Sequence, residues 1–296
     1  MKILRFLCLT VALLLVLGFA YYLDKSPALS PVPNDGTIST ETEEVSLKGK
    51  TILNFGDSIF GNYSAPNDIS SHLAYLTNAT VYNVAFGGCR MSVHQQEQYN
   101  AFSMCTLAEA IAQKDWTVQN TMMARQDWKP NATYAGNLAA LQAVDFNEVD
   151  MITISYGTND FTANCAIASS DPYDTATFAG ALRYSIETIL SAYPDIEIVL
   201  CTPTYRFWMD KDNNYAFLDD STTREIGGRK LTDFVQATKE VAAEYDLYCI
   251  DNYNGSGICY ENRTACFPQN DGTHPNQTGI KMIADHMAKV LLEHYT

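Results

Sequence analysis

The chain has 296 residues, of which 47% are hydrophobic and 18% are charged, a composition typical of a globular protein with a substantial core. Its 19 Lys and Arg residues against 34 Asp and Glu residues leave a formal net charge of −15. Binding to nucleic acid or to anionic membrane surfaces requires basic surface, so this charge disfavours both kinds of partner.

The N-terminal residues have the pattern of an export signal. Lys2 and Arg5 precede an apolar run that continues to Leu23. A short basic region before an apolar stretch is typical of a signal peptide, and about 18 apolar residues are also the lower limit for a membrane-spanning helix. We therefore predict that residues 1–23 are a signal peptide or an N-terminal membrane anchor. The protein is expected to be extracellular or on the cell surface, with membrane contact only through this segment if it is uncleaved.

Residues 24–47 are rich in Pro, Ser, Thr and acidic residues and contain little that a core could bury. Such a composition is typical of a flexible linker. The folded domain is expected to span residues 48–296.

Five short runs rich in Ile, Val and Leu are apolar on both faces, as strands of a buried parallel sheet are. Longer helix-like segments separate them, which predicts an α/β layered domain with right-handed crossovers. The predicted strands are Thr51–Phe55, Thr80–Val84, Met151–Ser155, Ile196–Cys201 and Leu247–Ile250. The predicted helices are Asp68–Leu76, Thr106–Lys114, Tyr134–Val144, Thr177–Ala192, Arg224–Tyr245 and Gln277–Glu293.

Residues that follow the first three predicted strands supply chemistry at one edge of the sheet, where open α/β sheets hold their sites. Ser58 follows the first strand in "GDS", Gly88 follows the second in "FGGC", and Asn159 follows the third in "YGTND". A serine hydroxyl is a candidate nucleophile, and a glycine N–H or an Asn side-chain amide can stabilise an oxyanion. Each segment by itself is equally consistent with an ordinary turn or helix cap.

Near the C-terminus, Asp271 and His274 lie three residues apart in "DGTHPN", just before a predicted helix. A tight turn can bring these side chains together, so that the carboxylate orients the imidazole and the other ring nitrogen can accept a serine proton. Together with the residues after the strands, this pair completes the set of groups needed for acyl transfer.

Four blocks in order resemble the SGNH (GDSL-type) hydrolase superfamily: "NFGDSIFGN", "NVAFGGC", "YGTND" and "DGTHPNQTG". The resemblance covers roughly residues 48–296. It implies a three-layer α/β/α sandwich with a flavodoxin-like parallel sheet and an esterase, lipase, thioesterase or deacetylase activity. No metal or other cofactor is expected.

The resemblance also implies a role for each matching residue. Ser58 is then the nucleophile, His274 the base and Asp271 its orienting acid. The oxyanion hole is formed by the Ser58 and Gly88 N–H groups and the Asn159 side chain. Two residues depart from the usual pattern: Ile59 stands where leucine is common, and Cys89 follows the oxyanion glycine.

The predicted function is that of an exported serine esterase that removes short acyl groups, such as acetyl groups on carbohydrates, from a small-molecule or polysaccharide substrate. A lipase or lysophospholipase and an acyltransferase are alternatives within the family, and a non-catalytic surface carbohydrate-binding domain is an alternative from another class. Tyr205, Phe207 and Trp208 follow the fourth predicted strand and are candidates for the substrate pocket, with core packing as the alternative.

The chain has eight cysteines and no Cys-x-x-Cys pair, so no zinc site is indicated. Cys259 and Cys266 flank a loop-like stretch five residues before Asp271. An oxidising compartment favours a disulfide between them, which would stiffen the loop that carries the acid and base. Spacing alone does not establish the pairing.

Overall fold

The structure, a computed structural model, describes residues 46–295. The predicted signal peptide or anchor, residues 1–23, and residues 24–45 of the predicted linker lie outside this range. The linker prediction is wrong at its C-terminal end, because Leu47 is buried and its N–H donates to the Thr77 carbonyl at 2.8 Å. The folded region therefore begins before Lys48. Within residues 46–295, no helix combines the length and the apolar character that crossing a membrane requires.

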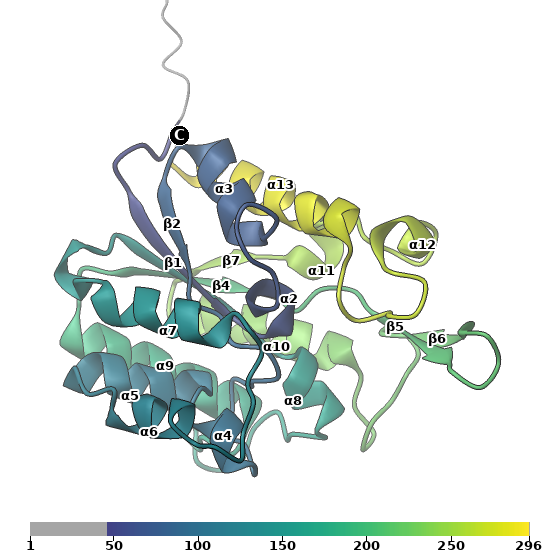
Figure 1. The fold of residues 1–296 in the computed structure, drawn as a ribbon, viewed down its shortest axis with the longest axis horizontal. Coiled ribbons are helices and arrows are strands. Elements are labelled where there is room, and N and C mark those ends of the chain that lie inside the picture. The colour runs from purple at the N-terminus through teal and green to yellow at the C-terminus, as the bar shows by residue number, and fades with distance from the viewer. Residues whose placement is uncertain (1–45, 296) are drawn as a thin grey trace, which may run out of the picture. The chain divides into compact units, whose positions relative to one another are not determined.

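A five-stranded parallel sheet with the order β2-β1-β3-β4-β7 runs through the molecule (Figure 1). Its strands are β1 (Thr51–Gly56), β2 (Thr80–Asn83), β3 (Met151–Ser155), β4 (Glu197–Cys201) and β7 (Tyr248–Ile250). These five strands were all predicted, and their ends agree to within one residue. The strand order is that of flavodoxin-like sheets, in which the chain reverses direction across the sheet between its first and third strands.

Helices cover both faces of the sheet and give the predicted three layers. On one face lie α3 (Ile69–Thr77) and α13 (Gln277–His294), which pack against each other. On the other face lie α5 (Met104–Gln113), α7 (Tyr134–Ala143), α9 (Phe178–Ala192) and α10 (Leu231–Glu244). Shorter helices are α2 (Ser58–Gly61), α4 (Glu97–Asn100), α6 (Thr117–Met123), α8 (Thr158–Thr162), α11 (Asn252–Gly255), α12 (Arg263–Cys266) and a 3₁₀ turn, η1 (Phe146–Glu148).

The two helical layers are held by separate cores, because successive side chains of a strand point to opposite faces. In β1, Ile52 packs with α3 and α13, whereas Leu53 and Phe55 pack with α5, α7 and α9. All three side chains are fully buried. Since burying each such side chain contributes about 1.5–3 kcal/mol, this alternation fixes the register of the sheet on both sides. The carboxyl ends of the strands are thereby held at one edge.

Two features of the chain between β4 and α10 differ from the predictions. A hairpin, β5 (Phe207–Asp210) and β6 (Ala216–Asp220), forms a separate antiparallel pair that projects beside the sheet (Figure 1). The helix predicted from Arg224 begins only at Leu231, because residues 224–230 form a turn in which Gly227 and Gly228 have φ angles of 58° and 74°. Left-handed backbone of this kind cannot continue an α-helix.

Replacing Gly61 by alanine is expected to lower the free energy of unfolding by about 1–3 kcal/mol. Its Cβ would lie 2.7 Å from the Ala85 carbonyl oxygen, so the contact fixes α2 against the segment after β2. Gly136→Ala in α7 is the matched control, because open space surrounds that position. The control is expected to gain about 0.5–1 kcal/mol, since alanine loses less entropy in a helix. Urea unfolding measures both, and equal effects would contradict the close packing at Gly61.

Candidate active site

Ser58 lies where β1 ends and the short helix α2 begins. Asp57 caps this helix, since its carboxylate accepts the Ile59 N–H at 2.9 Å. The cap keeps the backbone turned sharply at Ser58, whose side chain emerges at the carboxyl edge of the sheet. Ser58 is only 6% exposed, so its hydroxyl faces a restricted volume.

His274 joins Ser58 to Asp271 through its two ring nitrogens. Nε2 lies 2.9 Å from the Ser58 Oγ, and Nδ1 lies 2.7 Å from Asp271 Oδ2. The other carboxylate oxygen of Asp271 accepts the N–H groups of Thr273 and His274. With a proton on Nδ1 donated to Asp271, Nε2 is free to accept the proton of the serine hydroxyl.

Three contacts from distant parts of the chain hold the loop that carries this pair. The Tyr63 hydroxyl donates to the Pro275 carbonyl at 2.6 Å, and the Phe207 N–H donates to the Gly272 carbonyl at 2.9 Å. Arg206 Nη2 donates to Thr273 Oγ1 at 2.6 Å. The imidazole is therefore held in place by the segment after α2 and by the start of the hairpin.

Tyr134 fixes the orientation of the peptide group that precedes Gly88. The Tyr134 hydroxyl donates to the Gly87 carbonyl at 2.6 Å. In a trans peptide the N–H points opposite to the C=O, so the Gly88 N–H is directed away from Tyr134. Gly88 has a φ of +81°, and a Cβ there would lie 3.0 Å from the Tyr99 ring, which explains the glycine. Neither Ser58 N–H nor Gly88 N–H donates to an acceptor among residues 46–295.

Asn159 lies in the first turn of α8, directly after β3. Its Nδ2 donates to the Cys89 carbonyl at 2.8 Å, which leaves one amide hydrogen available. The next residue, Asp160, is fully buried and accepts the Met91 and Ser92 N–H groups, both at 3.0 Å. It thereby ties the loop after β2 to the end of β3.

The Cys89 side chain, unusual at its position, is fully buried. Its sulfur lies 3.3 Å from the Tyr134 hydroxyl, and burial raises the pKa of the thiol to about 12. Cys89 is therefore a neutral packing group beneath the turn rather than a second nucleophile.

The predicted pocket residues separate into two groups. Phe207 and Trp208 line a cavity of about 310 Å³ between the hairpin and residues 270–273. Tyr205 does not line it, because its side chain is buried and its hydroxyl donates to Asp220 at 2.9 Å. The core-packing alternative is correct for Tyr205.

The predicted disulfide between Cys259 and Cys266 is not formed, and both thiols are free. Cys266 points into the core between α12 and α13, where its sulfur lies 3.5 Å from that of Met282. The loop before Asp271 is held by hydrogen bonds instead: Asn262 accepts the Cys259 N–H, and the Cys266 carbonyl accepts the Asn276 N–H, both at 2.8 Å.

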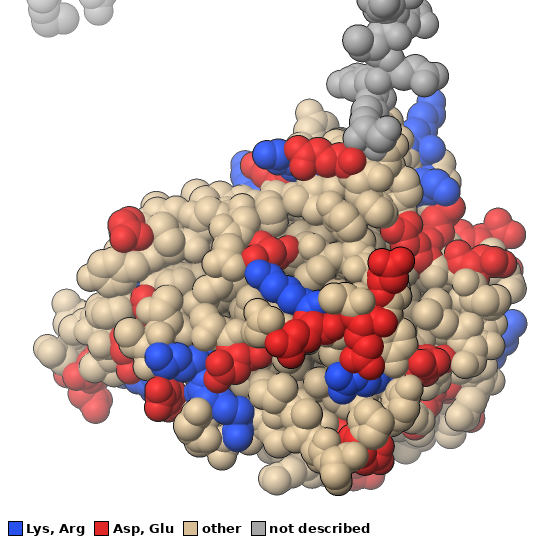
Figure 2. Space-filling model, turned by 180° about the vertical axis from the view of Figure 1, so that it is seen from behind, with Lys and Arg blue, Asp and Glu red and all other residues tan. Residues whose placement is uncertain are grey.

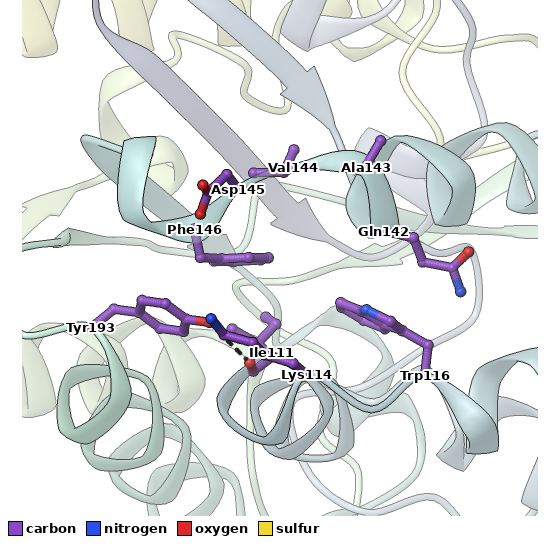
Figure 3. Close-up of a pocket in the computed structure, with 9 residues that line it drawn as sticks. All are labelled: Ile111, Lys114, Trp116, Gln142, Ala143, Val144, Asp145, Phe146 and Tyr193. Carbon is purple, nitrogen blue, oxygen red and sulfur yellow. Dashed lines mark hydrogen bonds between the residues drawn. The ribbon is translucent and has the colours of Figure 1, made fainter.

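A hollow of about 390 Å³ lies away from this site, where α5, α7 and α9 end (Figure 3). Trp116, Phe146 and Tyr193 form its walls, and Lys114, Gln142 and Asp145 stand around it. It contains no hydroxyl or thiol paired with a base, so it lacks the groups for nucleophilic chemistry. Among residues 46–295, no three His, Cys, Asp or Glu side chains cluster as metal ligands would.

Asp57 and Asp271 have opposite pKa shifts. Burial raises the pKa of Asp57 to about 6, although the Ile59 N–H and the positive charge of His274 oppose it. For Asp271, burial also acts to raise the pKa, but the hydrogen bonds from His274 and Thr273 outweigh it and lower the pKa to about 2. Asp271 is therefore ionised at any pH above about 4, where its stabilising contribution is fully present.

Asp57→Asn is expected to change the pH dependence of stability. Because the folded pKa of Asp57 is raised, the folded state binds its proton more tightly, and stability is lost as pH rises from about 4 to 6. The amide retains an acceptor for Ile59 and does not ionise. Relative to the wild type, the variant should therefore gain up to about 3 kcal/mol between pH 4 and pH 7 in urea unfolding. A difference independent of pH would contradict the raised pKa.

The chain matches one known protein family. A family model described as GDSL-like Lipase/Acylhydrolase matches residues 52–287. A search of curated proteins found no match.

Solved structures share the fold at low identity. A protein from Lactobacillus plantarum has a TM-score of 0.57 at 18% identity, covering 84% of this chain and 99% of its own. A carbohydrate acetylesterase from Sinorhizobium meliloti has a TM-score of 0.51 at 14% identity, covering 83% and 99%. An aryl esterase from M. smegmatis has a TM-score of 0.50 at 16% identity, covering 82% and 98%. With the family match over most of its length, the chain belongs to the GDSL-like lipase/acylhydrolase family and is an ester-hydrolysing serine hydrolase.

Proposed function

We propose that Ser58, His274 and Asp271 are the catalytic triad of an exported esterase that removes short acyl groups from carbohydrates. The observation that carries the assignment is the unbroken chain from Ser58 Oγ through the imidazole to the carboxylate, with distances of 2.9 and 2.7 Å. This is the arrangement that converts a weakly nucleophilic hydroxyl into a reactive one.

The reaction follows from the positions of these groups. Ser58 Oγ attacks the ester carbon while His274 Nε2 takes the hydroxyl proton, and the imidazolium returns that proton to the departing alcohol oxygen. Asp271, ionised throughout, stabilises the imidazolium. Water then attacks the acyl-enzyme, His274 takes a proton from it, and the carboxylic acid leaves as the proton returns to Ser58.

The oxyanion of each tetrahedral intermediate is stabilised by the N–H groups of Ser58 and Gly88 and the free amide hydrogen of Asn159. These donors are fixed before substrate arrives by the Asp57 cap, the Tyr134–Gly87 contact and the Asn159–Cys89 contact. Donors fixed in this way need no reorganisation in the transition state, which is the basis of their catalytic effect.

Several observations support short acyl groups on carbohydrates over the alternatives. The cavity beside the triad loop is lined by polar groups such as Lys211 and Asn270 next to the partly exposed Trp208, a mixed lining that suits a polar alcohol such as a sugar. Est24 from S. meliloti, with a similar fold, is described as a carbohydrate acetylesterase. Figure 2 shows acidic side chains interspersed with basic ones on the back of the molecule, without a broad basic field for anionic lipid surfaces or nucleic acid. Export rests on the N-terminal pattern around Lys2 and Arg5.

Ser58→Ala is expected to abolish hydrolysis of p-nitrophenyl acetate while leaving the unfolding midpoint within the range of the wild type. Ser64→Ala, an exposed serine six residues away, is the control and should retain full activity. Residual turnover in Ser58→Ala equal to that of the wild type would remove Ser58 as the nucleophile. Undiminished activity of His274→Ala would likewise remove the base.

Asn159→Ala should lower kcat by roughly 10²–10³-fold with little change in KM, as expected for a donor that acts on the transition state. Steady-state kinetics on the same ester measure this. A change confined to KM would assign Asn159 to substrate binding instead.

A substrate panel separates the alternatives. Acetylated sugars should be cleaved with a higher kcat/KM than p-nitrophenyl esters of long fatty acids, because Ser58 is only 6% exposed and its hydroxyl faces a restricted volume. A preference for long chains would identify a lipase, and ester products formed from an added alcohol an acyltransferase. Glycan binding that Ser58→Ala leaves intact, without hydrolysis by the wild type, would identify a binding domain.

A further inference from the structure

Arg206 is a buried charge that pairs with no carboxylate of residues 46–295. It is 8% exposed, and its Nη1 and Nη2 donate to the neutral hydroxyls of Thr162 and Thr273 at 3.1 and 2.6 Å. Within residues 46–295 it forms no ion pair, and its buried Nε–H has no acceptor. Asp57 and Asp271 lie near enough to interact electrostatically with the guanidinium, but neither forms an ion pair with it. Buried charges in proteins are normally paired, and residues 46–295 supply no carboxylate within ion-pair distance of this guanidinium.

Arg206 is also part of the wall of the 310 Å³ cavity beside the triad loop. Trp208 supplies an aromatic surface there, and Lys211 adds a second positive charge. The Asp271 carboxylate borders the same cavity, but it is occupied by the hydrogen bonds from His274 and from its own loop. The cavity thus combines an apolar face with an excess of unpaired positive charge.

A second arginine beside the same indole shows what is particular to Arg206. The guanidinium carbons of Arg206 and Arg224 lie 4.4 and 4.7 Å from the centroid of the Trp208 ring. Arg224 is ion-paired with Asp219 at 2.7 Å and does not line the cavity. Both guanidinium groups stack on the Trp208 ring, but only Arg206 lines the cavity, and only Arg224 has an ion pair among residues 46–295. Arg224 is therefore the matched control for Arg206.

The cavity lies on the alcohol side of the scissile bond. His274 must deliver its proton to the departing alcohol oxygen, so the alcohol part of the substrate lies next to the loop that carries the imidazole. Asp271, Gly272 and Thr273 of this loop line the cavity.

We propose that Arg206 binds an anionic group, most suitably a carboxylate, on the alcohol part of the ester substrate. The substrate class is then an acylated acid, such as an acetylated sugar acid, rather than a neutral sugar. The planar guanidinium retains N–H donors beyond the two given to the threonines, and carboxylate geometry matches them. This inference rests on the proposed esterase function, since it names the substrate of the same site.

The activity test compares a singly acetylated methyl hexuronoside with its neutral uronamide, which has nearly the same shape. The wild type is expected to have at least a tenfold higher kcat/KM for the carboxylate, the effect of a charge-assisted hydrogen bond. Arg206→Met should bring the two values together, Arg206→Lys should restore part of the ratio, and Arg224→Gln should keep it. Equal values in the wild type, or a ratio that survives Arg206→Met, would overturn the proposal.

A binding test separates failure of this inference from failure of the esterase assignment. Calorimetry on Ser58→Ala, which keeps the cavity, measures binding of the deacetylated methyl hexuronoside and its uronamide. Tighter binding of the acid that is lost with Arg206→Met supports the proposal even if no ester is turned over. If p-nitrophenyl acetate is hydrolysed but acid and amide bind equally, the esterase assignment holds and Arg206 serves only to position the Thr273 loop.

Discussion

The hydrogen bond between Ser58 and His274 connects residues 216 positions apart, and much of the structure serves to keep its 2.9 Å length. The serine is fixed by β1 and the Asp57 cap. The histidine is fixed by the start of α13, which packs against α3 on the same face of the sheet as α2. Tyr63 bridges the two halves directly by donating to the Pro275 carbonyl. The proposed nucleophile and base, so far apart in sequence, can meet only because a rigid sheet and its helices determine both positions.

The proposed oxyanion donors, Gly88 and Asn159, depend on a second set of buried contacts. Asp160 brings the loop after β2 to the end of β3, and Tyr134 from α7 orients the glycine peptide within that loop. Burial raises the pKa of Asp160, yet Ser92 and Met91 compensate by supplying hydrogen bonds. A fully satisfied buried carboxylate of this kind fixes one loop geometry, because every alternative leaves unpaired polar groups in the core.

The parallel sheet, the main helices and the five residues of the site could be predicted from the sequence because each has a local or ordered signal. Short apolar runs that include Ile52 in β1 and Ile152 and Ile154 in β3 mark these strands. The four blocks around Ser58, Gly88, Asn159 and His274 occur in a fixed order. The hairpin could not be predicted in this way. Its strands are four and five residues long, and β6 exposes three of its five side chains, so no core-facing period is present.

Other parts depend on tertiary contacts that a single sequence does not reveal. Arg206 was adjacent to the predicted pocket residues, but nothing in "TPTYRFW" indicates which side chain is buried without a partner. The buried hydroxyl contact of Tyr205 with Asp220 likewise depends on the hairpin. The Cys259–Cys266 spacing permitted a disulfide, whereas the packing of Cys266 against Met282 directs its sulfur into the core.

The hairpin between β4 and α10 stands outside the five-stranded sheet and adds no residue to its register. Phe207, its first residue, and Arg206 just before it contact Gly272 and Thr273 in the loop that carries Asp271 and His274, while residues 211–215 at its tip are exposed. Loops of this kind tolerate changes in length and sequence at small cost to the fold. Lys211 and Tyr215 of the tip line the cavity that we propose for the alcohol part of the substrate, so changes in the tip would alter the choice of alcohol without moving Ser58 or His274.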